Sequence, residues 1–409
     1  MASEIEIGGR AQRRALSVVA GSQLLVLTLW FSASAVSPQL EAEWGLSTTE
    51  ASWLTLAVQI GFVLGALASA LLNLADLIPA RRLFVVATII AAGANAALVT
   101  LEGSPLVQAT ILRLIVGIAL AGVYPAGLKV ISGWFTKRRG MALGVLVGAL
   151  TVGSAFPHLV RGTGLDWMPV ILTSSALALL GGLLMWLFVQ DGPHDTTASP
   201  FSMKLVGAVV RNRGVRLSTY GYLGHMWELY AMWAWTAAFL LASAQDGGYS
   251  TGWVSTATFA IIAIGGVGSW WAGALADRFG RERIAAGAMA VSGTSALLSP
   301  FVFGRAPWLV IALFLVWGLS VVADSAQFSA LVTETAEDRF RGTALTLQTA
   351  VGFLLTLVTI RGVPMIAESL GWQWAFPWLA IGPALGIAAM VRLARIGTHG
   401  ARTEPVGSP

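Results

Sequence analysis

The stretch that decides the fold is residues 273–283, Gly-Ala-Leu-Ala-Asp-Arg-Phe-Gly-Arg-Glu-Arg. It follows an apolar run and places Asp277 directly before Arg278, with Arg281 three residues further on. An Asp at a helix end accepts hydrogen bonds from Arg and from the N-terminus of a neighbouring helix, and Gly280 permits a tight turn. We therefore expect a charged loop between two helices that acts as a gate.

Parts of this stretch recur about 200 residues earlier in the chain. The recurring pairs are Leu74-Ala75-Asp76 with Leu275-Ala276-Asp277, Trp53 with Trp253, Arg139–Leu143 with Arg341–Leu345, and Arg161-Gly162 with Arg361-Gly362. A nearly constant offset predicts two copies of one unit in the same orientation. The first copy of the loop keeps Asp76 and Arg81, which we also expect to gate, but lacks the flanking glycines.

The composition excludes a water-soluble protein. Of 409 residues, 56% are hydrophobic and only 11% are charged, whereas soluble domains carry about 25% charged residues. This excludes a soluble enzyme, a nucleic-acid binder and a disordered chain. The chain has no Cys, so disulfides and thiol chemistry are excluded as well.

Twelve apolar segments approach the roughly 20 residues that a membrane-spanning helix needs. They are 16–38, 51–75, 83–101, 106–128, 141–160, 168–189, 217–243, 252–275, 284–303, 308–330, 343–366 and 373–391. We expect an all-α integral membrane protein with two six-helix bundles related by a pseudo-two-fold axis along the membrane normal. The expected parts are a first bundle (1–190), a cytoplasmic linker (191–216), a second bundle (217–397) and a polar cytoplasmic tail (398–409).

The basic residues predict the orientation. With the N-terminus in the cytoplasm, 21 of the 25 Lys and Arg residues fall on cytoplasmic stretches, which is a strong positive-inside signal. Arg13-Arg14 and Ala33-Ser34-Ala35 resemble a cleavable signal peptide, but the repeat favours a retained first helix. We expect a multi-pass protein of the plasma (inner) membrane with both termini in the cytoplasm. Residues 203–210 of the linker are expected to form either a short amphipathic surface helix or a plain tether.

Residues 273–283 resemble the signature loop of the major facilitator superfamily. Arg113 followed by Gly117 and Gly122 is similar to the fourth-helix pattern of the same family. The resemblance covers essentially the whole chain and implies the fold of two six-helix bundles. It also implies secondary transport by a rocker-switch form of alternating access, with the site between the halves near the midplane of the membrane.

Ionisable residues within spans are costly and are candidates for function. Arg113 shares a helical stripe with Tyr124, and we expect both to line a cavity that holds anionic groups. The alternative is a structural Arg bonded to backbone carbonyls. Arg361 is a second candidate for substrate binding; the alternative is that its side chain reaches the membrane interface.

A proton site is predicted in the seventh span. His225 and Glu228 are three residues apart and share a face with Tyr222, a further candidate for substrate binding. A buried carboxyl group beside a His can take up and release a proton; the alternative is a neutral pair that fixes helix packing. Asp324, on a stripe with the substrate-binding candidate Trp317, is a second proton site or a gating partner.

No ATP-binding motif or metal-ligand spacing is present in the sequence, so we expect neither an enzyme nor a cofactor or metal. The leading hypothesis is proton-coupled symport of a small organic or inorganic anion, based on Arg113 and Arg361. The alternative is proton-driven efflux of a lipophilic or cationic compound. The expected partners are the small-molecule substrate, protons and the lipid bilayer, with no nucleic acid, and the chain is expected to be a monomer.

Overall fold

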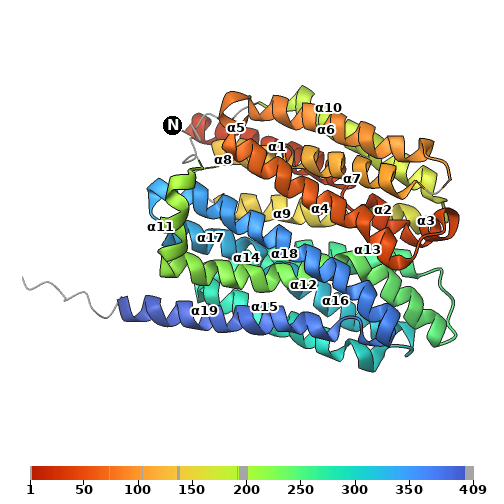
Figure 1. The fold of residues 1–409 in the computed structure, drawn as a ribbon. Coiled ribbons are helices and arrows are strands. Elements are labelled where there is room, and N and C mark those ends of the chain that lie inside the picture. The colour runs from red at the N-terminus through yellow and green to blue at the C-terminus, as the bar shows by residue number, and fades with distance from the viewer. Residues whose placement is uncertain are drawn as a thin grey trace, which may run out of the picture.

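Every element in the described part of the chain is helical. A computed structural model describes residues 2–72, 74–103, 105–135, 139–190, 192 and 201–400. The long helices run side by side along one axis (Figure 1). The expectation of an all-helical protein is confirmed.

The first half of the chain forms helices α1 to α10. Their bounds are α1 (Ala2–Leu27), α2 (Ser32–Ala35), α3 (Ser37–Trp44), α4 (Thr48–Leu71), α5 (Leu74–Leu77), α6 (Ala80–Ala96), α7 (Leu106–Leu120), α8 (Tyr124–Trp134), α9 (Arg139–Arg161) and α10 (Trp167–Phe188). The start of α4 is fixed by a capping box, in which Ser47 and Glu50 satisfy each other's backbone N–H groups.

The second half begins with the short helix α11 of the linker and continues to α19. The bounds are α11 (Val206–Arg211), α12 (Arg213–Asp246), α13 (Val254–Ala263), α14 (Gly265–Phe279), α15 (Arg281–Val302), α16 (Pro307–Ala323), α17 (Ser325–Thr335), α18 (Arg341–Leu370) and α19 (Ile381–Gly400). The Asn212 side chain caps α12 by accepting from the Val215 N–H.

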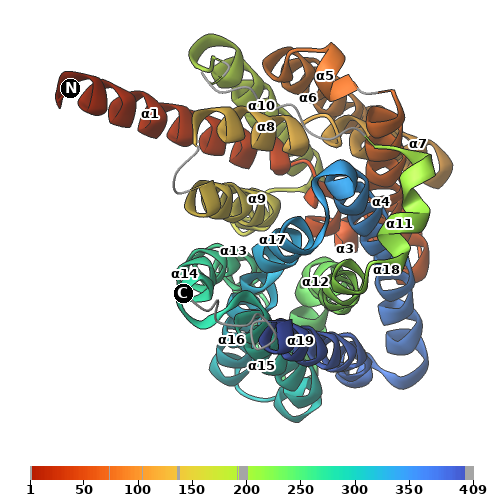
Figure 2. The same ribbon diagram turned by 90° about the vertical axis from the view of Figure 1, so that its left-hand side faces the viewer.

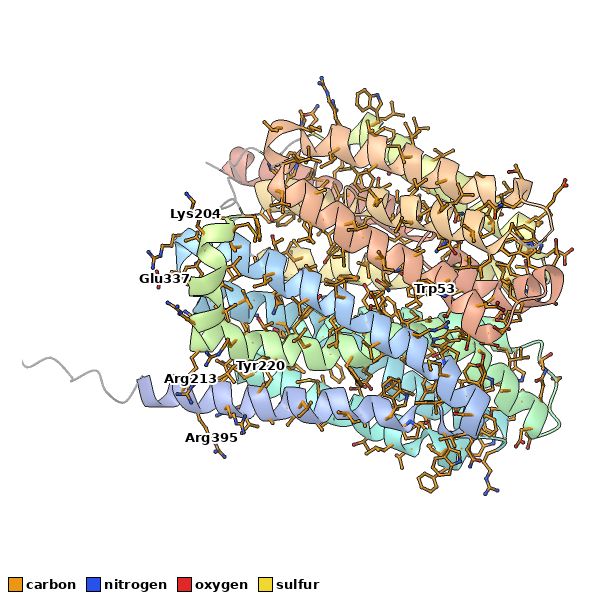
Figure 3. The ribbon with its side chains drawn as sticks, in the orientation of Figure 1. Trp53, Lys204, Arg213, Tyr220, Glu337 and Arg395 are labelled. Atoms are coloured by element: carbon orange, nitrogen blue, oxygen red, sulfur yellow. The ribbon has the colours of Figure 1, made fainter. Side chains whose placement is uncertain are left out.

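Seen along the helix axes, the two halves of the chain form two groups that lie next to each other (Figure 2). Across the boundary, α4 packs on α18, and α9 packs on α13 and α14. We call one end of the bundle the basic end, because Lys204, Arg213 and Arg395 project from it (Figure 3). The other end, which carries Thr49 and Glu368, is called the distal end.

Each of the two groups contains the same kind of close contact between two of its own helices. A Cβ atom on Gly117 would lie 2.2 Å from the Val58 carbonyl oxygen, so only Gly lets α7 approach α4 this closely. In the second group, a Cβ atom on Gly318 would lie 1.8 Å from the Ile261 carbonyl oxygen, where α16 meets α13. The same contact thus occurs twice, about 200 residues apart, as the internal repeat predicts.

Ten helices in the described part of the chain are long and apolar enough to cross a membrane. The chain is therefore a multi-pass membrane protein. The segments expected as spans one and seven are not among the ten. The first is broken between α1 and α2, and the seventh lies in α12, a helix of 34 residues that carries His225 and Glu228. The count of twelve spans stays a prediction.

Several expected spans are interrupted in the middle. Residues 28–31 separate α1 from α2, residues 121–123 separate α7 from α8, and Asp324 separates α16 from α17. An interrupted helix leaves backbone carbonyls without partners inside the chain. These interruptions determine where the polar side chains of the candidate site lie.

Candidate functional site

Arg113 is fully buried at the interruption between α1 and α2. Its guanidinium donates to the carbonyl oxygens of Leu29 at 3.0 Å, Trp30 at 2.5 Å and Leu54 at 3.2 Å. It also donates to Asn95 Oδ1 at 2.9 Å and to Ser32 Oγ at 3.1 Å. The cation therefore binds two carbonyls at the helix break, those of Leu29 and Trp30, and in addition the Leu54 carbonyl of α4. This is the structural alternative considered for Arg113.

The stripe expected to join Arg113 to Tyr124 is interrupted. Residues 121–123 form a turn, and Tyr124 begins the next helix, α8. Tyr124 is half-buried and lies close enough to Tyr222 and Tyr230 of the second group for electrostatic interaction. The structure thus places Tyr124 with Tyr222, both predicted from the sequence, and adds Tyr230.

Three ionisable side chains meet inside the second group. His225 Nδ1 lies 2.7 Å from Asp324 Oδ1, and both side chains are buried. Asp324 lies between the end of α16 and the start of α17, and His225 lies within α12. Glu228, one turn further along α12, is 1% exposed and lies close enough to Asp324 for their charges to interact.

The partner of His225 differs from the prediction. From their spacing on one helix face, His225 was predicted to pair with Glu228, whereas in the structure the His225 side chain contacts Asp324. Glu228 instead accepts from Trp317 Nε1 at 2.6 Å and from Ser292 Oγ at 2.8 Å. Trp317, expected to bind substrate, therefore holds a carboxylate. Ser292 was not predicted, because one Ser in an apolar helix gives no signal of its partner.

A set of aromatic side chains joins the two groups at the middle of the bundle. Their ring centroids lie 4.6 Å apart for Phe62 and Phe353, 5.1 Å for Tyr230 and Phe353, and 5.0 Å for Trp30 and Phe62. We call this set the aromatic seam. Its members are Trp30, Phe31, Phe62, Tyr230, Trp233 and Phe353. All are buried, and the sequence reasoning did not single out the set.

Several buried polar atoms have no hydrogen-bond partner within the described residues. They include both side-chain polar atoms of Gln59 on α4, both ring nitrogens of His158 on α9, Nε2 of His225 and Nε2 of Gln348 on α18. These helices come from both groups and include those that meet at the boundary. Buried polar groups normally bind protein, water or a ligand. The arrangement can therefore receive a polar part of a substrate.

Arg361 lies at the distal end, between the groups. It donates to the Thr49 carbonyl oxygen and to Ser52 Oγ at the start of α4, and its guanidinium lies 5.9 Å from the Trp53 ring. About two helical turns further along α18, Glu368 Oε1 accepts from Thr49 Oγ1 at 2.6 Å. These contacts hold α18 against α4 at the distal end.

The expected gating residues lie at the basic end. Arg281 forms an ion pair with Glu334 at 2.8 Å and donates to Gln327 Oε1 at 3.2 Å, which joins α15 to α17. Arg81 donates to the Val189 carbonyl at 3.2 Å and Arg278 lies over the Phe279 ring. The side chains of Asp76 and Asp277 lie outside the described residues.

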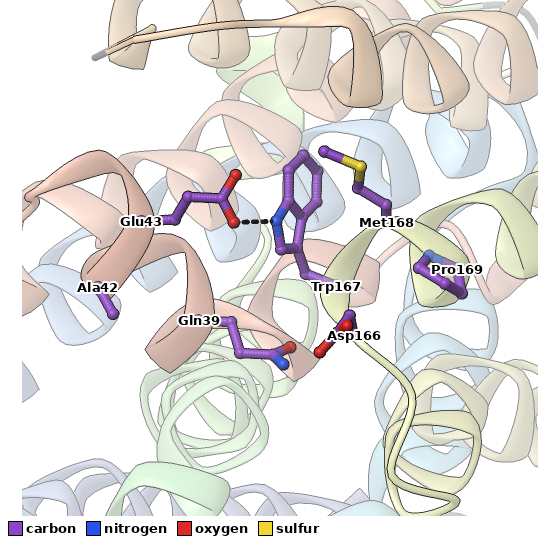
Figure 4. A pocket seen from close by; sticks show the side chains of 7 residues that line it. All are labelled: Gln39, Ala42, Glu43, Asp166, Trp167, Met168 and Pro169. Atoms are coloured by element: carbon purple, nitrogen blue, oxygen red, sulfur yellow. Dashed lines mark hydrogen bonds between the residues drawn. The ribbon is translucent and has the colours of Figure 1, made fainter.

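A separate hollow of about 600 Å³ opens at the distal end (Figure 4). Gln39, Ala42 and Glu43 line it from one side, and the start of α10, 166–169, from the other. Glu43 Oε2 accepts from Trp167 Nε1 at 2.5 Å. Beside it, burial raises the pKa of Glu41 above its ordinary value.

Within the described residues, no cluster of His, Asp or Glu could hold a metal ion.

A bundle of membrane-crossing helices in two repeated groups, with buried ionisable residues and unpaired polar atoms between helices, defines the class of membrane transporters. Comparison with protein families agrees. The profile of the Major Facilitator Superfamily matches residues 19–269, and the profile "Sugar (and other) transporter" matches residues 218–394. The chain belongs to the Major Facilitator Superfamily.

The chain is also similar to a curated protein, the MFS-type transporter pytF of Aspergillus terreus (strain NIH 2624 / FGSC A1156). The two are 28% identical over 173 residues. The match covers 41% of this chain and 56% of the relative's length. The match therefore supports the family. Proposals about the substrate and the coupling ion have to be based on the residues of this chain.

Proposed function

We propose that the chain transports its substrate by rocker-switch alternating access between two six-helix bundles, residues 1–190 and 217–397, joined by the linker 191–216. The support is the contact between the groups. Side chains of α4 and α18 hold the groups together at the distal end, and the aromatic seam closes the middle. Such contacts can break without unfolding either group. The conformation described is then closed at the distal end.

The proposed membrane placement follows from charge. The basic end carries Lys204, Arg213 and Arg395, and the distal end carries Glu43 and Glu368. By the positive-inside rule, the basic end faces the cytoplasm and the distal end faces the outside of the plasma (inner) membrane. Both termini are then cytoplasmic.

The proposed coupling ion is the proton, and the His225–Asp324 pair carries it. With one proton shared, the pair is neutral overall, which a buried site tolerates. When that proton leaves, the pair carries a net negative charge beside Glu228. A buried negative charge is costly unless a cation binds to it, so the Asp324 carboxylate then favours the binding of a cation. Proton loss and cation binding are thus linked at one place. The 2.7 Å contact between two buried ionisable groups is the observation that carries this proposal.

For the substrate, the geometry favours a lipophilic or cationic compound that is exchanged for protons. The anion hypothesis depends on Arg113 and Arg361, and in this conformation both donate to carbonyl or hydroxyl oxygens of the chain. The carboxylates of Glu228 and Asp324 also have partners, Trp317 and Ser292 for the first and His225 for the second, but each carboxylate has further lone pairs that can accept from a cation. Together with the aromatic rings, this suits an organic cation. An anion would have to displace Arg113 from the break between α1 and α2.

A thermal-shift screen of the purified transporter tests this choice. Lipophilic cations, neutral aromatic compounds and small anions are compared at pH 6 and pH 8. We expect cations to stabilise the protein, and to do so more strongly at the higher pH, because the proposal links cation binding to proton loss. Stabilisation by anions alone, abolished in Arg361→Gln, would support the anion hypothesis instead.

A further inference from the structure

The linker helix α11 lies across the basic end of the bundle, transverse to the long helices (Figures 1 and 2). Because the long helices cross the membrane, α11 lies in the plane of the membrane surface. The segment contains a helix, as the first of the two expectations requires, and its contact with the membrane surface stays a prediction.

One face of α11 is packed on the second group. Val209 is 3% exposed and belongs to a small apolar cluster with Val332 of α17, Ala344 of α18 and Phe340 in the turn between these two helices. Just before the helix, the Ser202 N–H donates to Thr343 Oγ1 at 3.0 Å. These contacts fix how α11 is rotated about its own axis.

The opposite face is exposed and mixes apolar with basic side chains. Val210 of α11 is 50% exposed and Arg211 beside it is exposed, and in the 3-10 turn Met203–Leu205 just before the helix Met203 is 68% exposed and Lys204 is exposed. We call these four residues the linker face. The segment 201–220 contains four basic residues and no acidic one. An interfacial helix that binds anionic lipid has this combination.

The surroundings of the linker face are suited to lipid. α11 packs against α18 and α12. Tyr220 on α12 is 52% exposed, and Val351 on α18 is 38% exposed. An exposed Tyr near the end of a membrane-crossing helix is typical of the headgroup region. The exposed acid Glu337, at the same end in Figure 3, is paired with Arg339 at 2.8 Å.

We propose that the linker face binds the headgroup of an anionic phospholipid in the leaflet at the basic end. Lys204 and Arg211 contact the phosphate, and Met203 and Val210 enter the acyl region below it. The two apolar residues favour a lipid over a soluble polyanion, which would leave them in water. The proposal rests on the membrane placement given above but on neither the substrate nor the coupling ion.

Lipid binding by the full-length protein in neutral detergent tests the proposal. Native mass spectrometry counts the bound phosphatidylglycerol and phosphatidylcholine as each is titrated. The variant is Lys204→Gln with Arg211→Gln, and the matched control is Arg305→Gln, an exposed basic residue at the opposite end. A second variant, Met203→Asn with Val210→Asn, leaves both charges in place. Inorganic phosphate is added in a separate arm.

We expect phosphatidylglycerol binding to weaken roughly tenfold or more in the double Gln variant, with phosphatidylcholine binding unchanged. The Asn variant should weaken it as well, and the control should not. Equal phosphatidylglycerol binding by wild type and both variants would overturn the proposal, as would an equal loss in Arg305→Gln. If inorganic phosphate at millimolar concentration displaces the lipid completely, the site binds free anions and the lipid assignment is wrong. None of these results depends on transport activity.

Discussion

His225 and Asp324 are 99 positions apart in the chain, and their side chains meet at 2.7 Å inside the second helix group. The contact is possible because α16 ends at Ala323 and α17 begins at Ser325, so that Asp324 lies at the interruption and faces α12. His225 Nδ1 lies against Asp324 Oδ1 without the alignment of a hydrogen bond, and the second ring nitrogen, Nε2, has no partner in the described part of the chain. A pair with one open nitrogen can pass a proton without losing its own contact.

Glu228 provides a first prediction, which separates a structural from a coupling role. Glu228→Gln keeps an oxygen that accepts from Trp317, so the fold and the melting temperature should change little. Trp317→Phe removes the donor and leaves a buried carboxylate oxygen unsatisfied, which should lower the free energy of unfolding by about 1–3 kcal/mol. Thermal unfolding in detergent measures both. A large loss of stability in Glu228→Gln together with none in Trp317→Phe would contradict the assigned contacts.

Arg113 is predicted to stabilise the break between α1 and α2. Arg113→Ala removes the hydrogen bonds to the Leu29 and Trp30 carbonyls at the break and to the side chains of Ser32 and Asn95, and the free energy of unfolding should fall by roughly 3 kcal/mol or more. Arg113→Lys should not restore it, because one ammonium cannot reach all of these oxygens. Arg305→Ala serves as the control. If Arg113→Ala melts like the wild type and loses only ligand binding, the residue belongs to the substrate site.

The contact between Thr49 and Glu368 makes alternating access directly testable. The chain has no Cys, so Thr49→Cys with Glu368→Cys introduces one unique pair. We expect oxidation or a short thiol crosslinker to join the pair and stop transport, and reduction of the disulfide to restore it. The single variants, treated in the same way, are the controls. Full transport by the crosslinked protein would show that the distal end does not open.

Much of the site could be predicted from the sequence, because ionisable residues are rare in apolar segments. That rarity identifies His225, Glu228 and Asp324 without any knowledge of packing. Their pairing could not be predicted, since it depends on how α12 meets the interruption at Asp324. No Pro or Gly marks that interruption.

The role of Arg113 shows the same limit. Its position within a span follows from the sequence, but its partners do not. Two of them are the Leu29 and Trp30 carbonyls at a break in a stretch that the sequence predicts to be continuous helix. The aromatic seam likewise combines residues from distant helices. In contrast, the internal repeat visible in the sequence agrees with the matching contacts at Gly117 and Gly318, where the same packing needs the same small residue in both halves.

The most direct test of the central claim, proton coupling through the His225–Asp324 pair, is transport by Asp324→Asn in proteoliposomes. Accumulation of a compound identified by the thermal-shift screen is measured with and without a pH gradient, and exchange is measured without one. Asp246→Asn, at the exposed end of α12, is the control. We predict that Asp324→Asn retains exchange and loses at least tenfold of the pH-driven accumulation. Accumulation equal to that of the wild type would contradict the account.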